Sequence, residues 1–181
     1  MRIIAGQWRG RTLAAPAGSR TRPTSDRARE GLFSMLTSRL GSFEGLRAAD
    51  LFAGSGALGL EALSRGAACC LFVDNDREAV AALKRNAAAL DAEARAEIKH
   101  QSAEHLAPPD RPFDLVFLDP PYEGGLAERA LAHVADARWL TPGALVSVET
   151  GERLVAIPAT LEVETERRFG KARLHLLRAR F

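Results

Sequence analysis

Strand-like apolar runs alternate with helix-like segments along the middle of the chain, and this alternation restricts the fold more than any other feature. Five runs have the length and residue types of strands: 46–52, 69–74, 94–101, 113–119 and 143–150. Between them, 57–66, 76–90 and 124–140 carry alanine and leucine at three- and four-residue spacing, which predicts helices. Parallel strands need such crossovers, so we expect an α/β fold with a mostly parallel sheet and helices on both faces.

The C-terminal part ends the alternation. Residues 160–169 and 172–181 are both strand-like, and only a short turn at Gly170 and Lys171 separates them. Because this turn leaves no room for a helix, the two runs predict an antiparallel hairpin at the end of the sheet.

The N-terminal part is expected to form a small extension. Residues 2–6 and 10–16 predict a β-hairpin, and residues 24–40 predict an amphipathic helix with Thr24 or Ser25 as its N-cap. With 181 residues, the chain is long enough for one domain and too short for two ordinary ones. We therefore expect a basic β-hairpin extension at 1–23 and one compact unit at 24–181.

Composition and residue spacing exclude several classes of protein. Hydrophobic residues make up 46% and charged residues 27%, which is typical of a soluble globular protein. No apolar run is long enough to cross a bilayer, and arginines stand where a signal peptide needs apolar residues, so we expect a cytoplasmic protein without a membrane partner. The adjacent Cys69 and Cys70 and the four histidines lack the spacing of metal ligands, so no metal is expected.

Positive charge is concentrated near both ends. Residues 1–39 hold eight arginines against Asp26 and Glu30, and six basic residues follow Glu166: Arg167, Arg168, Lys171, Arg173, Arg178 and Arg180. Arginine clusters suit a polyanion because they pair with phosphates and release counterions, although a solvated face is the commoner explanation of any single run. Two runs favour a nucleic-acid partner, and we expect Arg9, Arg11 and Arg22 to contact RNA.

A glycine loop follows the first strand-like run. Gly54, Gly56 and Gly59 have the G-x-G-x-x-G spacing that lets a backbone turn tightly and approach a ligand, with Ser55 between the first two. Asp74 ends the second run about 20 residues further on, where an acid can accept both hydroxyls of an adenosine ribose, and Asn75 is beside it. The loop therefore predicts a nucleoside site.

The acid before the loop indicates which nucleoside would bind. Asp50 would face the anionic pyrophosphate of a dinucleotide, so a cationic or zwitterionic ligand fits better. S-adenosylmethionine meets that description, with NAD as the rival and a tight turn without ligand as the plain alternative. Ser102 and Ala103 follow the third run, where they would read the adenine edge.

The stretch DPPY, from Asp119 to Tyr122, follows the fourth strand-like run. Pro120 and Pro121 fix φ and have no N–H, so this turn presents acceptors only. Asp119 and the Pro120 carbonyl would accept the two protons of an exocyclic amino group, which frees the nitrogen lone pair to attack a donor methyl group, and Tyr122 would stack on the base. The plain alternative is a proline-stiffened exit from the strand.

Several stretches resemble the RsmD family of bacterial 16S rRNA guanine-N2 methyltransferases: MRIIAGQWRGRTLAAP, TRPTSDRAREGLFSML, DLFAGSGALGLEALSRGA, VFLDPPY and RRFGKARL. The resemblance covers nearly the whole chain. It implies a Rossmann-like class I methyltransferase fold with a seven-stranded sheet, S-adenosylmethionine as donor, and a guanine of the small ribosomal subunit or its late assembly intermediate as substrate.

The resemblance also implies roles for particular residues. Thr24 and Asp119 would contact the donor together with the glycine loop, and the segment around Arg22 and Arg27 would close the donor site and face the RNA. Relatives often have Asp or Asn where this chain has Ser102. We expect a monomer.

Three other functions are compatible with parts of the pattern. A DNA adenine-N6 methyltransferase would use the same acceptors, although a chain of this length has no obvious DNA-recognition domain. An NAD-dependent oxidoreductase would use the glycine loop and leave DPPY unexplained. A non-catalytic RNA-binding assembly factor would use only the basic segments.

Overall fold

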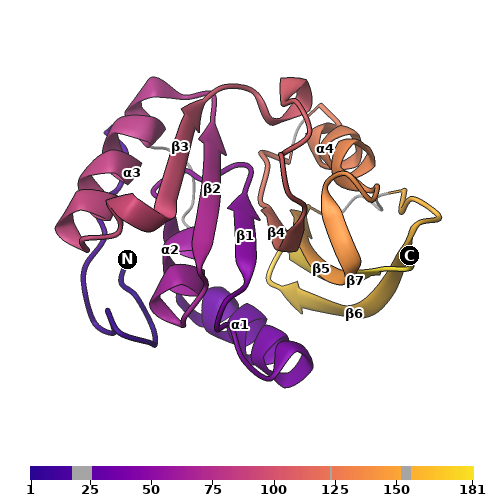
Figure 1. Ribbon diagram of the computed structural model, residues 1–181, viewed down its shortest axis with the longest axis horizontal. Coiled ribbons are helices and arrows are strands. Elements are labelled where there is room, and N and C mark those ends of the chain that lie inside the picture. The colour runs from indigo at the N-terminus through magenta and orange to yellow at the C-terminus, as the bar shows by residue number, and fades with distance from the viewer. Residues whose placement is uncertain (18–25, 123, 152–155) are drawn as a thin grey trace.

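The computed structural model describes residues 1–17, 26–122, 124–151 and 156–181. Seven strands form one sheet in the order β3-β2-β1-β4-β5-β7-β6 (Figure 1). Their bounds are β1 Arg47–Asp50, β2 Cys69–Asp74, β3 Ala96–His100, β4 Phe113–Leu118, β5 Leu140–Thr150, β6 Leu161–Phe169 and β7 Ala172–Ala179. The first five strands are parallel, whereas β7 is antiparallel to β5 and to β6, which confirms the predicted C-terminal hairpin.

Helices cover both faces of the sheet. The α-helices are α1 Asp26–Leu40, α2 Ala57–Ser64, α3 Arg77–Ala89 and α4 Leu126–Val134, and short 3-10 helices span Glu93–Arg95 and Ala103–His105. One core joins α1, α2 and α3 to one face through side chains such as Leu115 and Phe117 of β4. The other core joins α4 to the opposite face, where Val116 and Leu118 of the same strand point. β4 is therefore apolar on both faces, and the predicted α/β fold is confirmed.

The helix predicted over 124–140 is shorter than expected. It ends at Val134, and the backbone N–H groups of Trp139 and Leu140 turn back to the carbonyl of Asp136 at 3.1 and 3.0 Å. The Phe113 N–H donates to the Trp139 carbonyl at 2.7 Å, which draws this segment onto the sheet. The prediction was wrong here because Trp139 and Leu140 continue the apolar spacing of the helix, but Trp139 lies in the turn before β5 and Leu140 is the first residue of that strand.

The predicted N-terminal hairpin is present only as a single bridge between Arg2 and Thr12. The Ile3 N–H donates to the Arg11 carbonyl at 2.9 Å, so the two segments pair, but neither is long enough to form a strand. The N-cap predicted at Thr24 or Ser25 and the boundary predicted between 23 and 24 lie outside the described residues.

The N-terminal arm, residues 1–14, is held on α2 by a buried carboxylate. Glu61 of α2 accepts the backbone N–H groups of Ile4 at 2.7 Å and Ala5 at 3.0 Å, and the Nε–H of Arg65 at 2.8 Å. Ser64, one helical turn further on, accepts the Trp8 N–H at 3.0 Å. A buried acid is stable here because its oxygens are paired with donors.

Replacement of Glu61 by Ala should destabilise the protein. The change leaves two backbone N–H groups and Arg65 without their acceptor, so we expect the free energy of unfolding to fall by about 2–4 kcal/mol, measured by urea denaturation. Glu97→Ala, which removes only an exposed ion pair with Lys99, should cost less than about 1 kcal/mol. Equal losses in the two variants would show that Glu61 does not hold the arm.

Candidate functional site

Acidic residues stand at the carboxyl ends of four neighbouring parallel strands. Asp74 ends β2, Asp50 ends β1, Asp119 follows β4, and Glu149 is next to last in β5. These strands are adjacent in the order β2-β1-β4-β5, so the four side chains lie in a row at the carboxyl-terminal end of the sheet. Open parallel sheets bind their ligands at this end. We refer to these four residues as the acidic row.

The glycines of the loop after β1 meet different surroundings. Gly54 and Gly56 have positive φ values of 54° and 83°, which other residues rarely adopt. A Cβ at Gly54 would meet no atom within 4 Å, whereas one at Gly56 would lie 2.3 Å from Leu83 Cδ1. A Cβ at Gly59 would lie 2.3 Å from Phe72 Cε1, so this glycine lets α2 pack against β2. Gly54 therefore offers bare backbone beside open space.

Asp74 ties the glycine loop to the neighbouring strand. Its Oδ2 accepts the Gly54 N–H at 2.8 Å, and its Oδ1 accepts the Asp76 N–H at 2.9 Å. The Gln101 N–H donates to the Asp74 carbonyl at 3.0 Å, which brings the end of β3 alongside. The predicted nucleoside residues of the loop and of the second strand are therefore close together.

The other residues predicted around the nucleoside lie beside Asp74 and the loop. Asn75 is exposed, and its carbonyl lies 3.1 Å from His100 Nε2. Ser102 caps the 3-10 helix at Ala103 by accepting the Glu104 N–H at 3.4 Å, and Ala103 is buried. Ser55 is buried, and its hydroxyl lies 3.8 Å from Met1 Sδ.

Asp50 is an almost completely buried acid. Its Oδ2 accepts the Gly59 N–H at 3.0 Å, and its Oδ1 has no hydrogen-bond partner among the described residues. Burial raises the pKa of Asp50 from 3.8 to about 7; the Gly59 N–H opposes this rise, and the carboxylates of Asp119 and Asp74 add to it. Such a group is well suited to a cationic ligand, because a positive charge beside it would stabilise the ionised carboxylate against both the burial and the repulsion from Asp119 and Asp74.

Asn86 of α3 connects the glycine loop to the N-terminal arm, a role that no pattern in the sequence indicates. Its Nδ2 donates to the Ser55 carbonyl at 2.8 Å and to the Ala14 carbonyl at 3.0 Å, while its Oδ1 accepts the Ala14 N–H at 2.8 Å. An asparagine on an alanine-rich helix looks like a surface residue, but this one is 3% exposed.

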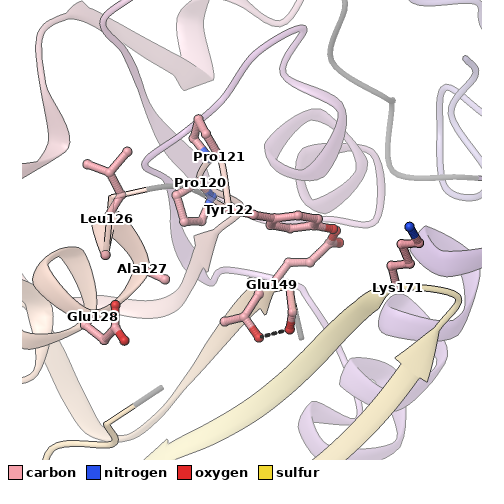
Figure 2. A pocket seen from close by; sticks show the side chains of 11 residues that line it. Pro120, Pro121, Tyr122, Leu126, Ala127, Glu128, Glu149 and Lys171 are labelled. Atoms are coloured by element: carbon pink, nitrogen blue, oxygen red, sulfur yellow. Dashed lines mark hydrogen bonds between the residues drawn. The ribbon is translucent and has the colours of Figure 1, made fainter. Parts of the chain in front are cut away.

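The DPPY turn borders a cavity of about 310 Å³ (Figure 2). It is lined by Pro120, Pro121, Tyr122, Gly125, Leu126, Ala127, Glu128, Glu149, Thr150, Gly151 and Lys171. The Tyr122 ring is 55% exposed and reaches across to Glu149, whose Oε1 accepts the Tyr122 hydroxyl at 2.6 Å. Asp119 lies in an adjoining narrow pocket, which Glu149 also lines. Three of the four residues predicted as catalytic therefore line the cavity, whereas Asp119 lines the neighbouring pocket and not the cavity itself.

Glu149 joins this site through strand pairing. In the parallel pair β4 and β5, Leu118 stands opposite Val148, so Asp119 and Glu149 come next along the two strands. The sequence shows that each residue lies near the end of a strand-like run, but it does not show that these strands are neighbours in that register. No sequence pattern therefore points to Glu149.

The predicted basic residues are only partly exposed to a partner. Arg9, Arg11 and Arg27 are exposed, although Arg11 also donates to the Ala89 carbonyl, and the predicted Arg22 and Thr24 lie outside the described residues. Arg29 is completely buried and donates to Asp26 and to the Arg2 carbonyl, both at 2.7 Å.

The C-terminal basic run is partly paired within the protein. Arg173 contacts Glu166 at 3.0 Å, and Arg178 contacts Glu164. These pairs cross from β7 to β6, so part of the positive charge counted at this end of the sequence is compensated by the acids of β6.

Two further findings concern the described part of the chain. No group of three or more His, Cys, Asp or Glu side chains in it is arranged to hold a metal ion, so the acidic row is not a metal cluster. None of its helices combines the length and the apolar character needed to cross a membrane.

Comparison with known proteins places the chain among methyltransferases. The family model Conserved hypothetical protein 95 matches residues 1–178. Ribosomal RNA small subunit methyltransferase D of Escherichia coli K12 is 39% identical over 178 residues, which cover 97% of this chain and 88% of the relative. The Haemophilus influenzae protein of the same name is 44% identical over 154 residues, covering 83% and 78%.

A solved structure agrees with this assignment. The Escherichia coli protein yhhF superposes with a TM-score of 0.87 at 38% identity, covering 99% of this chain and 98% of the other. The seven-stranded sheet with its antiparallel C-terminal hairpin is the class I methyltransferase fold. The chain belongs to the Conserved hypothetical protein 95 family, which is the RsmD family that its sequence stretches resemble.

Proposed function

We propose that this protein transfers a methyl group from S-adenosylmethionine to the exocyclic N2 amino group of a guanine in 16S rRNA, within the small ribosomal subunit or its late assembly intermediate. The observation that carries this proposal is the DPPY turn at the end of β4: Pro120, Pro121 and Tyr122 line a 310 Å³ cavity, and Asp119 lines the pocket next to it. The names of the relatives from Escherichia coli and Haemophilus influenzae support ribosomal RNA of the small subunit as the substrate class.

The residues at the ends of β1 and β2 fit the donor. S-adenosylmethionine supplies an electrophilic methyl group on a sulfonium, together with a positively charged amino group and an adenosine. Bare backbone at Gly54 allows the ligand a close approach. The Asp74 oxygens each accept one N–H of the protein, and a carboxylate has about four acceptor positions, so Asp74 can also accept ribose hydroxyls. The buried Asp50 would pair with the amino group.

The DPPY turn would prepare the guanine nitrogen for attack. Its lone pair is delocalised into the ring, so the amino group is a poor nucleophile while it stays planar. Two acceptors held rigidly by Pro120 and Pro121 would bind its two hydrogens and favour the tetrahedral geometry. The bond from the nitrogen to the methyl carbon would form as the carbon–sulfur bond of the donor breaks, leaving neutral S-adenosylhomocysteine, and the nitrogen would lose one proton to Asp119 or to water. Tyr122 would stack on the base and hold it in the cavity.

The exposed arginines of the N-terminal part would bind the RNA. Arg9, Arg11 and Arg27 carry charge to the surface, as contacts with phosphates require. We further propose that residues 1–23 are an RNA-facing extension of the methyltransferase domain at 24–181, and that the protein acts as a monomer.

Asp119→Ala should abolish methyl transfer and leave donor binding largely intact. We expect the rate to fall by at least about 100-fold, because the variant loses the acceptor that orients the amino group. Transfer is measured with radiolabelled donor and small subunits from cells that lack the enzyme, and binding is measured by calorimetry with S-adenosylhomocysteine. Asp110→Ala, an exposed acid outside the site, is the control. Normal methylation by Asp119→Ala would refute the assigned role.

Binding of S-adenosylhomocysteine should release a proton from Asp50 at pH 6.5. With a pKa of about 7, Asp50 is mostly protonated at this pH, and the ligand's positive amino group favours its ionised form. We expect release of roughly half to three quarters of a proton, measured by calorimetry in buffers of different ionisation enthalpy.

Asp50→Asn should remove this proton release, whereas the exposed Asp91→Asn should keep it. The raised pKa also means that the folded chain binds this proton more tightly than the unfolded chain. The unliganded protein should therefore lose stability as the pH rises from about 4 to 7, and Asp50→Asn should flatten this dependence. Identical proton release in both variants would contradict the pairing of Asp50 with the ligand.

Replacing Arg9 and Arg27 by Gln should weaken binding to small subunits and reduce its salt dependence. Each lost phosphate contact lowers the slope of log K against log salt by about 1. Arg138→Gln, which removes an exposed arginine paired with Asp136, should leave the slope unchanged. An unchanged slope in the Arg9 and Arg27 variant would remove these residues from the interface.

A further inference from the structure

Glu149 links the two parts of the candidate active site. It lines the narrow pocket that contains Asp119 and also the 310 Å³ cavity that the prolines and Tyr122 border. The β4 and β5 register places it beside Asp119, on a strand about 4.8 Å away. Glu128 is also a carboxylate of the large cavity, but it does not line the pocket that contains Asp119.

The position of Glu149 is fixed by its surroundings. Its backbone belongs to β5, between β4 and β7, where Glu149 pairs with Leu174. The Tyr122 hydroxyl donates to Oε1 at 2.6 Å, and Figure 2 shows the aromatic ring and the carboxylate meeting at the side of the cavity. A carboxylate on a central strand, oriented by a hydroxyl, is better placed to read a base than a side chain on a loop.

Guanine and adenine present different groups to such a carboxylate. In guanine, the N2 amino group is next to N1–H, so two neighbouring ring positions carry donors. In adenine, the amino group is next to N1 with a lone pair, which a carboxylate would repel. If Asp119 and the Pro120 carbonyl hold the amino group, a second acceptor beside Asp119 meets the adjacent ring position. An enzyme reads a flipped base through hydrogen bonds to this edge.

We propose that Glu149 selects guanine by accepting the N1–H of the target base, next to the amino group that Asp119 holds. This inference rests on the proposed function and adds a specificity residue to it. It also explains why a turn that suits any nucleobase amino group would reject adenine here, because the carboxylate beside it penalises an unprotonated N1. Lys171, which lines the other side of the cavity from the β6–β7 turn, carries a cation toward the same space.

The test combines a change in the enzyme with a change in the base. Once the methylated position is mapped, small subunits are rebuilt with guanosine or with 2-aminopurine riboside at that position. The analogue keeps the 2-amino group but has a lone pair at N1. Wild-type enzyme should methylate the analogue at least about tenfold more slowly than guanosine, because the carboxylate then meets a lone pair.

Glu149→Gln should methylate guanosine about tenfold to 100-fold more slowly and the analogue no more slowly than wild type, so the preference collapses. The amide keeps the shape of the side chain and can donate to an unprotonated N1. Equal losses on both substrates, or an unchanged preference, would overturn the proposal. If Glu149→Gln is inactive on both, Glu149→Asp decides: a preference for guanosine supports the proposal, and its absence overturns it.

Two further variants test whether another side chain of the cavity, rather than Glu149, reads the base. Tyr122→Phe removes the hydroxyl that orients Glu149 but keeps the carboxylate, so it should reduce the preference for guanosine less than Glu149→Gln does. If it abolishes the preference as completely as Glu149→Gln, the hydroxyl rather than the carboxylate reads the base, and the proposal fails. The same selective loss in Glu128→Gln would assign the role to Glu128 instead. Absence of methylation of guanosine particles by wild-type enzyme would refute the proposed function itself.

Discussion

The common direction of β2, β1, β4 and β5 is the constraint on which the site depends. Because these strands are parallel neighbours, residues far apart in sequence reach the same edge of the sheet, and each strand brings an acid there. Four carboxylates in a row repel one another, and burial adds to the cost at Asp50. The fold offsets part of this cost with backbone N–H groups from Gly54, Gly59 and Asp76. A cationic donor and an amino group on the substrate would offset more.

Local sequence patterns were sufficient to predict those parts of the site that lie within a single segment of the chain. The glycine loop, Asp74 and the DPPY turn each depend on a strand followed by a few special residues, so their spacing predicts their place at the edge. Glu149 and Asn86 could not be found in this way, since their roles come from the β4 and β5 register and from the packing of α3 on the loop. The error at Trp139 and Leu140 has a similar cause, because burial on the sheet replaced the helical spacing.

The N-terminal arm is attached to the same framework that shapes the donor loop. Glu61 holds the arm on α2, and Asn86 holds Ala14 and the Ser55 carbonyl with one amide. Movement of the arm away from α3 would therefore break the bonds of Ala14 to the same Asn86 amide that binds the Ser55 carbonyl of the loop. If the arm contacts the RNA and the loop contacts the donor, as proposed, the two contacts would be connected through this buried amide.

The charged side chains of the two outer strands affect how the sheet could associate with other molecules. β6 and β3 are its two outer strands, and an outer strand presents unpaired backbone groups that can join the sheet of another molecule. β6 carries Glu162, Glu164 and Glu166, and β3 carries Glu97 and Lys99. In-register parallel alignment of either outer strand with a copy of itself would bring like charges together after the peptide groups had begun to pair. The charged residues of the outer strands thus oppose growth of the sheet into fibres, which would leave the protein free to reach the substrate proposed for it.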